Sequence, residues 1–535
     1  MESRTFDYIV VGAGSAGAAV AYRLSESGKY TVLVLEAGRE SHPWTRIPVG
    51  FAKLIQNPAA NWLYSSEPDA GSNGRRIPVP RGKLLGGSSS INGMVFVRGQ
   101  KQDFDIWAQL GNRGWSYDDV LPVFKAMESY KGEGDEGYRG HDGPLKVSES
   151  LESGPLYDAI IEAGRQVGLP SPKDYNGETQ EGIVMSQTTI RKGRRMSTAH
   201  CYLDPARNRP NLTIQANALT ERLIVKGGKC LGVRYTVNGR QHEALVNHEV
   251  IVSAGTVNSP QLLELSGIGQ PERLKDLGIE VHRELKGVGE NLRDHYAPRM
   301  RWKVPPELGL TYNDKAKGLG LVFQALKYAF TEKGLLGMTA APLRAFIRTR
   351  PGLEAPNAVI GWAPFLIGNN YTLARESGVT AFTHILRSES TGSIHATAAD
   401  PKSPPAINFN FLSAQLDRDV TVEGMRFLRS IMTAPALQGI VTDEIAPGID
   451  VDSDEELLEW TRNNAETTYH PVGTCKMGPD SDPMAVVDHR LRVRGIRGLR
   501  VADASIMPTL TSGNTNAPSI MIGEKASRMV LEDAG

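Results

Sequence analysis

The sequence predicts an α/β fold in which an α+β domain with an antiparallel sheet is inserted into a domain built on a parallel sheet. Three observations lead to this prediction. The chain has 535 residues, well beyond the size at which one hydrophobic core stops growing. Its N-terminal part alternates strand, glycine-rich turn, helix and strand. In its middle part, proline-rich breaks separate short segments in which apolar and polar residues alternate, a pattern that is typical of an antiparallel sheet.

The N-terminal unit begins with an apolar run, Phe6–Val11, that ends in glycines, as a buried strand of a parallel sheet does. Apolar residues spaced three and four apart follow from Ala16 to Leu24, which predicts a helix. Thr31–Glu36 then predicts a second strand. Together they form a βαβ unit of the expected length, about 30 residues.

The motif Gly12-Ala-Gly14-Ser15-Ala16-Gly17 lies between this strand and this helix. Its first glycine permits a tight turn, its second lets the backbone approach a pyrophosphate, and its third lets helix and strand pack closely. The helix N-terminus adds N–H donors and a positive dipole. Glu36 follows at the spacing of the acid that binds a ribose hydroxyl. Alone, the motif would be a common structural turn; in this context it predicts a Rossmann-like domain for FAD or NAD, because an acid at position 36 disfavours NADP.

Later segments predict the rest of both sheets. Strands are expected at Leu212–Gln215, Glu249–Val252 and Leu499–Asp503. Between the first two, Leu223–Val225 and Gly232–Val237 are expected to form a meander with a tight turn at Asn238-Gly239. A helix is expected from Ser519 to about Leu531, with Pro518 in its first turn. In the middle part a helix is expected over Lys315–Phe330, and strands over Phe382–Leu386 and Ser393–Thr397.

Composition excludes several classes of function. Lys plus Arg and Asp plus Glu both number 60, so no net charge favours nucleic acid or an anionic membrane. The three cysteines lie far apart, which predicts neither a disulfide framework nor a zinc site, and we expect no metal. The uncharged stretch Tyr8–Tyr22 is interrupted by glycines and is too short for the roughly 20 apolar residues of a membrane span. We therefore expect a cytoplasmic protein without a leader or stable membrane insertion, with any membrane contact peripheral.

Six ordered segments extend over almost the whole chain and resemble the glucose-methanol-choline (GMC) family of oxidoreductases. They are Arg81–Met94, Gly255–Gly269, Gly287–His295, Tyr469–Gly478, Leu499–Pro508 and Gly513–Pro518. The first two resemble the two family signatures. The resemblance implies FAD rather than NAD as the cofactor, and oxidation of an alcohol as the activity. It also implies a discontinuous FAD-binding domain (1–150, 196–295 and 470–535) with a substrate domain in two parts (151–195 and 296–469).

The resemblance also assigns residues to the cofactor. Gly87, Asn92 and Gly93 would line the isoalloxazine, Asp503 would lie near the ribityl or pyrophosphate portion, and the helix that opens at Pro518 would face the flavin pyrimidine. Further residues expected at the FAD are Ala37, Ser88, Met94, Thr220, Ala504 and Asn516. Some members attach the flavin to a histidine in the first signature. Ile91 stands there in this chain, so we expect noncovalent FAD.

His470 and Asn514 are the predicted catalytic pair. Alcohol oxidation requires a base for the hydroxyl proton while a hydride leaves the carbon, and histidine suits that role near neutral pH. His470 lies in Tyr-His-Pro-Val-Gly-Thr, at the position of the family's catalytic histidine, and Asn514 lies where members carry Asn or a second His. The Asn514 amide can bind the substrate oxygen without titrating. His141 and His295 are interpreted as structural.

The predicted function is therefore oxidation of an alcohol, a primary alcohol or polyol, by an enzyme similar to sorbose, polyethylene-glycol and choline dehydrogenases. The electrons would pass to a quinone or dye-like acceptor, slightly favoured, or to oxygen, which would make the enzyme a peroxide-forming oxidase. The alternatives are an NAD-dependent dehydrogenase, a hydroxynitrile lyase-type member and a flavoprotein without catalysis. No clear carboxylate or aromatic cage for a quaternary ammonium group is visible in the sequence.

Overall fold

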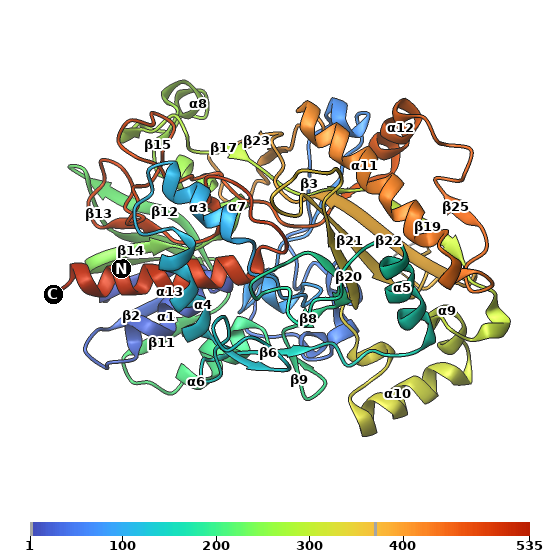
Figure 1. Cartoon of the computed structure of the whole chain (residues 1–535). Coiled ribbons are helices and arrows are strands. Elements are labelled where there is room, and N and C mark those ends of the chain that lie inside the picture. Colours follow the sequence, from blue (N-terminus) through green and yellow to red (C-terminus); the bar gives the residue numbers. More distant parts are fainter. Residues whose placement is uncertain (1–3, 369–371) are drawn as a thin grey trace.

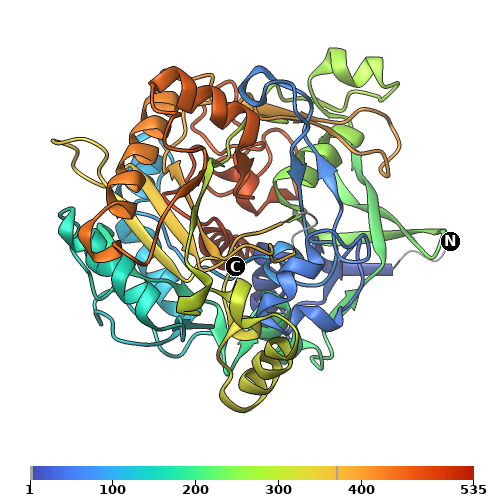
Figure 2. The same ribbon diagram turned by 90° about the vertical axis from the view of Figure 1, so that its right-hand side faces the viewer.

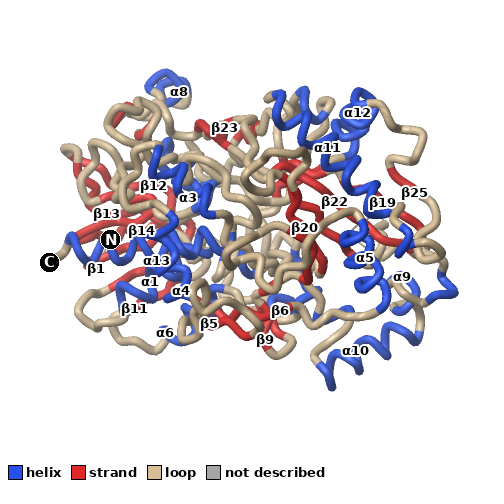
Figure 3. The backbone as a smooth tube through the Cα atoms, in the orientation of Figure 1, coloured by secondary structure: helices blue, strands red, loops and turns tan. Residues whose placement is uncertain are grey.

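The structure is a computed structural model that describes residues 4–368 and 372–535. Its strands gather in two main regions joined by long loops (Figure 3). In Figure 1 the region on the left contains both termini and a mixed sheet, and the region on the right contains an antiparallel sheet. The α/β architecture predicted from the sequence is confirmed.

The first sheet is parallel at its centre. Its strands β11 (Leu212–Gln215), β2 (Val32–Leu35), β1 (Arg4–Val11), β14 (Arg240–Val252) and β27 (Leu499–Val501) pair side by side in the same direction. β14 continues into an antiparallel ribbon with β13 (Lys229–Val237) and β12 (Ala218–Lys226). Asn238 and Gly239 both have positive φ at the β13–β14 turn, as a tight hairpin turn requires. The predicted strands and meander are confirmed.

Helices α1 (Ser15–Ser25) and α13 (Asn516–Asp533) pack against each other beside this sheet. They share its core with α3 (Lys101–Gln109) and α4 (Tyr117–Met127), whereas α7 (Gly255–Leu265) packs against β12. The predicted C-terminal helix is confirmed and begins slightly earlier than expected. Both α1 and α13 lack a side-chain cap at their N-termini, so their first N–H groups remain available to a ligand.

The second sheet is antiparallel and has the order β25-β19-β22-β21-β20-β7. Its strands are β7 (Gly182–Met185), β19 (Arg299–Lys303), β20 (Leu343–Ile347), β21 (Ala358–Ala363), β22 (Gly378–Ile385) and β25 (Glu444–Ala446). Its outer face packs against α5 (Pro155–Gln166) and α11 (Gln415–Met432), and α12 (Asp454–Asn464) packs on α11. Figure 2, viewed from this side, shows the orange helices alongside the gold strands.

Two expectations for the middle part change in detail. Ser393–Thr397 was expected in the same antiparallel sheet, but β23 (Gly392–His395) belongs to a separate three-stranded sheet with β17 (Glu290–Leu292) and β24 (Ala406–Asn408). The helix expected from Lys315 is two helices, α9 (Tyr312–Lys315) and α10 (Leu319–Thr331), because Gly318 between them has a φ of +52°. Across the described ranges, no helix is long and apolar enough to cross a membrane.

Candidate active site

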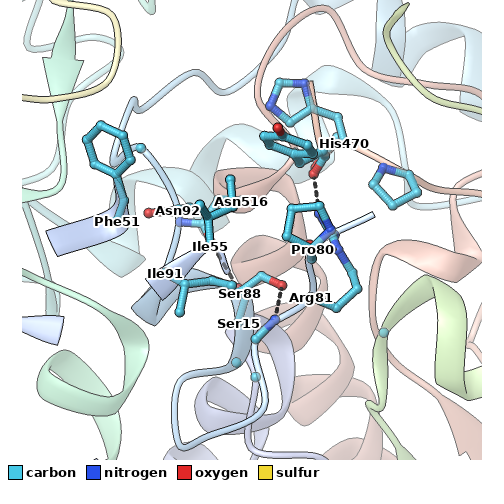
Figure 4. Close-up of a pocket in the computed structure, with 18 of the residues that line it drawn as sticks. Ser15, Phe51, Ile55, Pro80, Arg81, Ser88, Ile91, Asn92, His470 and Asn516 are labelled. Carbon is cyan, nitrogen blue, oxygen red and sulfur yellow. Dashed lines mark hydrogen bonds between the residues drawn. The ribbon is translucent and has the colours of Figure 1, made fainter. Parts of the chain in front are cut away.

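One cavity of about 500 Å³ connects the carboxyl end of the parallel sheet with the inner face of the antiparallel sheet. It brings together the predicted catalytic pair His470 and Asn514 and most of the predicted cofactor residues. These are Gly12, Gly14, Ser15, Ala16, Glu36, Ala37, Gly87, Ser88, Asn92, Gly93, Met94, Thr220, Asp503, Ala504 and Asn516. Figure 4 shows Ser15 and Ser88 toward one end of this cavity and His470 toward the other. Gly17 and Pro518 do not line it.

The glycine turn after β1 shapes the first end of the cavity. Gly12 has a φ of +95°, and a Cβ there would lie 2.4 Å from the carbonyl oxygen of Ser253. A Cβ on Gly17 would lie 2.0 Å from the carbonyl oxygen of Gly12, so this glycine allows the close contact of turn and helix. A Cβ on Gly14 would meet only the Cα of Gly87, at 3.9 Å. The backbone at Gly14 is therefore open to the cavity, as close approach by a pyrophosphate requires.

Glu36 lies at the end of β2 and is buried. Its carboxylate accepts hydrogen bonds from the backbone N–H groups of Ala13 (3.1 Å) and Gly38 (2.8 Å). Burial raises its pKa from 4.5 to about 7, against the effect of these two hydrogen bonds. Nearby, the Oγ1 of Thr220 is buried and has no hydrogen-bond partner among the residues that the structure describes. A carboxylate and an unpaired hydroxyl at this end of the cavity fit the hydroxyl groups of a nucleotide.

The loop Gly86–Met94 forms a second wall. Gly87 has a φ of +51°, and a Cβ on it would lie 2.8 Å from the Cα of Gly14. The Oδ1 of Asn92 accepts from the backbone N–H of Met94 (3.0 Å) and from the Nη1 of Arg195 (2.8 Å). Arg195 also donates to the carbonyl oxygens of Ser89 and Asn92. Arg195, which does not line the cavity, thus holds this loop in place.

The N-termini of α1 and α13 meet at the cavity. The hydroxyl of Ser15 donates to the Oδ1 of Asn516 at 2.8 Å, which links the first residues of the two helices. Uncapped helix N-termini stabilise negative charge. Together with the glycine turn and Glu36, this arrangement fits a dinucleotide whose pyrophosphate these N–H groups would bind.

Asp503 follows β27, and its carboxylate accepts three hydrogen bonds from within the protein. Its carboxylate accepts from the backbone N–H groups of Gly255 (2.8 Å) and Ser505 (2.8 Å) and from the hydroxyl of Ser259 (2.6 Å). These contacts join β27 to the start of α7. The Asp503 side chain therefore orders this wall of the cavity.

A chain of hydrogen bonds determines which nitrogen of His470 carries a proton. The Nε2 of His295 lies 2.9 Å from the carbonyl oxygen of Leu386, which can only accept, so this nitrogen carries the hydrogen. The Nδ1 of His295 is then an acceptor, and it lies 3.0 Å from the Nδ1 of His470. The Nδ1 of His470 must therefore carry the hydrogen, and its Nε2 is the unprotonated nitrogen.

Asn514 completes this chain at the cavity. Its Nδ2 lies 2.8 Å from the Nε2 of His470, and its Oδ1 accepts from the Nη1 of Arg344 at 3.3 Å. Since Arg344 can only donate, the amide presents its N–H to His470. Burial lowers the pKa of His470 well below 6.5, and the neighbouring His295, His384 and Arg344 lower it further. His470 is thus neutral near pH 7 and presents an unprotonated nitrogen to the cavity.

The position of His295 differs from the sequence interpretation of a purely structural histidine. Its ring bonds directly to His470 and stacks on His384, with ring centroids 4.2 Å apart. Asp294 accepts from the backbone N–H groups of both His295 (2.7 Å) and His470 (2.9 Å). His141, by contrast, lies outside the cavity and bonds to Glu136 and Tyr130. The sequence offered only one signal for His295, its place in the segment Gly287–His295.

His295, His384 and His470 have ring nitrogens within 4.8 Å of one another, close enough to hold a metal ion. Their Nδ1 atoms are already engaged, however. The Nδ1 atoms of His295 and His470 bond to each other, and the Nδ1 of His384 lies 2.8 Å from the carbonyl oxygen of Ile385. This cluster is satisfied as a hydrogen-bonded group of neutral histidines.

Comparison with known proteins decides the family. Residues 6–297 match the N-terminal family model of the GMC oxidoreductases, and residues 388–523 match the C-terminal one. The chain belongs to the GMC oxidoreductase family. It is 44% identical over 530 residues to a protein of Rhizobium johnstonii named oxygen-dependent choline dehydrogenase, covering 98% of this chain and 95% of that one. A protein of the same name from Photobacterium profundum is 41% identical, over 98% and 93% of the two chains.

Solved structures of other GMC oxidoreductases share the fold. A pyridoxine 4-oxidase from Mesorbium loti superposes with a TM-score of 0.88 at 30% identity, over 98% of each chain. A formate oxidase superposes with a TM-score of 0.92 at 27% identity, over 100% of this chain and 99% of that one. This GMC oxidoreductase is accordingly an FAD-dependent enzyme that oxidises a CH–OH group.

Proposed function

We propose that this enzyme oxidises its alcohol with His470 as the general base and Asn514 as the residue that positions the substrate oxygen. The observation that carries the proposal is the hydrogen-bond chain from Leu386 through His295 and His470 to Asn514 and Arg344. It holds His470 in the tautomer whose Nε2 can accept a proton. A general base must be unprotonated and within hydrogen-bond reach of the proton that it removes.

The chain's own residues would act as follows. An alcohol that enters beside Asn514 accepts a hydrogen bond from the amide and gives its hydroxyl proton to the Nε2 of His470. The resulting imidazolium is stabilised through its Nδ1–H by His295. FAD, when bound, supplies the acceptor for the hydride that leaves the carbinol carbon. The residues that fit FAD are the glycine turn, Glu36 and Thr220 for the nucleotide end, and the loop Gly86–Met94 beside the catalytic pair.

We propose further that FAD is held without a covalent bond and that oxygen reoxidises it. Ile91 occupies the position from which some family members bond to their flavin, and its side chain has no nucleophilic atom. The relatives named oxygen-dependent choline dehydrogenase and the oxidases among the structural neighbours support oxygen as the acceptor, whereas the sequence alone slightly favoured a quinone or dye. The boundaries of the FAD-binding and substrate domains stay predictions.

The test compares single variants in anaerobic stopped-flow reduction by alcohol. His470→Ala should retain its flavin but be reduced at least ~10²-fold more slowly, since a lost general base costs about that much. Asn514→Ala should lose only about tenfold, the effect of one neutral hydrogen bond. His141→Ala, an exposed histidine outside the cavity, is the matched control and should behave as the wild type. Near-native reduction in a flavin-loaded His470→Ala variant would contradict the assignment, and a larger loss at Asn514 would reverse the two roles.

A further inference from the structure

Arg344 lies in the middle of β20, on the face of the antiparallel sheet that borders the cavity. Its neighbours Leu343 and Ala345 pack on the opposite face, in the core beneath the covering helices, because side chains alternate along a strand. Arg344 is only 3% exposed. A buried guanidinium is costly unless it has a counter-charge and hydrogen-bond acceptors.

The contacts of Arg344 within the protein are few. Its Nε donates to the hydroxyl of Ser186 at 3.1 Å, and its Nη1 donates to the Oδ1 of Asn514 at 3.3 Å. Its guanidinium also lies near the rings of Tyr175 and Phe346, 5.9 and 5.7 Å from their centroids. Within residues 4–368 and 372–535, no carboxylate pairs with Arg344 and no atom accepts from its Nη2.

Three other buried arginines of this chain are neutralised by carboxylates. Arg98 and Arg139 pair with Glu128, and Arg500 pairs with Glu249 and Asp533. Arg195 is also buried without a carboxylate, but it lies outside the cavity and holds the loop Gly86–Met94 through carbonyl and amide oxygens. Arg344 instead borders the cavity beside Asn514, so its missing partner is a feature of that cavity. It indicates that an anion from outside the chain completes the site.

The other charged residues around the cavity agree with an anion bound at Arg344. The two carboxylates that line it, Glu36 and Asp503, belong to the parallel sheet and bind backbone N–H groups there. Arg299 also lines the cavity and is paired with Glu466 at 3.1 Å. Arg81 lines the end that contains His470, where it donates to the carbonyl oxygens of Pro80 and Tyr469. Among the described residues, this end therefore has cations and no lining acid. The rest of that wall is apolar, with Leu335, Met338, Phe365 and Phe382.

We propose that the substrate is a hydroxycarboxylate whose carboxylate binds Arg344 while its hydroxyl lies at His470 and Asn514. The inference rests on the proposed function and adds the class of substrate. Arg344 and His470 bond to opposite ends of the same amide, so the carboxylate and the carbinol carbon are only a few bonds apart. The hydroxyl proton passes to His470 and the hydride to FAD, which leaves an oxocarboxylate. A quaternary ammonium alcohol such as choline would place its charge beside a guanidinium of the same sign.

Binding is tested first, without turnover, by calorimetric titration of the FAD-loaded enzyme with acetate. The wild type should bind acetate, Arg344→Lys should retain binding because the charge remains, and Arg344→Met should bind at least ~10-fold more weakly. Arg348→Met is the matched control, because Arg348 follows β20, pairs with Glu181 outside the cavity and is exposed. Flavin content shows that each variant is folded. Equal acetate binding by the wild type and a flavin-loaded Arg344→Met variant, or none by the wild type, would overturn the proposal.

Flavin reduction is then compared between alcohols that differ in charge. In the wild type, 3-hydroxypropanoate should reduce the flavin at a lower concentration than propan-1-ol, and 3,3-dimethylbutan-1-ol should do so at least ~10-fold more efficiently than choline, its cationic isostere. Arg344→Met should remove both differences. Preference for choline over its uncharged isostere would refute the inference while leaving His470 as the base. If no alcohol reduces the flavin, the proposed function fails and the acetate titration alone decides the role of Arg344.

Discussion

The carboxyl group of Glu36 should make FAD binding depend on pH. Burial raises its pKa to about 7 in the protein without cofactor. Ribose hydroxyl groups donate to the ionised carboxylate, so FAD binds best after Glu36 has lost its proton. Binding is therefore expected to weaken as the pH falls through 7 and to reach a plateau above it. The affinity falls toward acid because the pKa of Glu36 is raised. In mild acid Glu36 is then mostly protonated, and a protonated carboxyl group is the poorer hydrogen-bond acceptor.

The size of the effect follows from the same pKa. At a pH of about 5.5 roughly one Glu36 in thirty is ionised, which lowers the affinity for FAD about thirtyfold, or about 2 kcal/mol. Glu36→Gln cannot titrate and should bind FAD with an affinity that changes little over this range. At a pH of about 8 the variant should bind more weakly than the wild type, since a neutral amide accepts a weaker hydrogen bond than a carboxylate.

The assay is titration of the apoprotein with FAD, followed by quenching of flavin fluorescence, at several pH values. The glutamine variant separates Glu36 from other groups that titrate in the same pH range, such as Asp294 beside His470, whose pKa burial raises to about 6. Wild-type affinity that is constant from acid to neutral pH would refute the reasoning. An equal decrease in Glu36→Gln would also refute it, because the titrating group would then lie elsewhere.

Two further outcomes are expected. Heat or acid should release intact FAD into the supernatant, because Ile91 offers no atom for a covalent link; flavin that remains with the precipitated chain would contradict noncovalent binding. Substrate-reduced enzyme mixed with oxygenated buffer should be reoxidised as fast as it turns over and should form one hydrogen peroxide for each flavin; slow reaction with oxygen and rapid reaction with a soluble quinone or dye would instead identify a dehydrogenase.

Much of the FAD-binding half could be predicted because its constraints are local. The tight turn at Gly12, the open backbone at Gly14 and the acid at Glu36 follow from a short βαβ segment, where neighbours in sequence are neighbours in space. Apolar runs predicted the parallel strands for the same reason. The sequence did not predict the break between α9 and α10. The periodicity of apolar residues continues across Gly318, but the helical backbone conformation stops there.

The sequence by itself determined the family, the cofactor and the candidate pair His470 and Asn514. Only the tertiary structure brought His295 to His470, through the pairing of β18 (Tyr296–Ala297) with β26 (Glu466–Thr467). Side chains along β20 point alternately to the two faces of its sheet, and only this placement directed Arg344 toward Asn514 rather than into the core. Both contacts join residues more than a hundred positions apart. Such contacts depend on strand pairing and sheet faces, which the local order of residues does not specify.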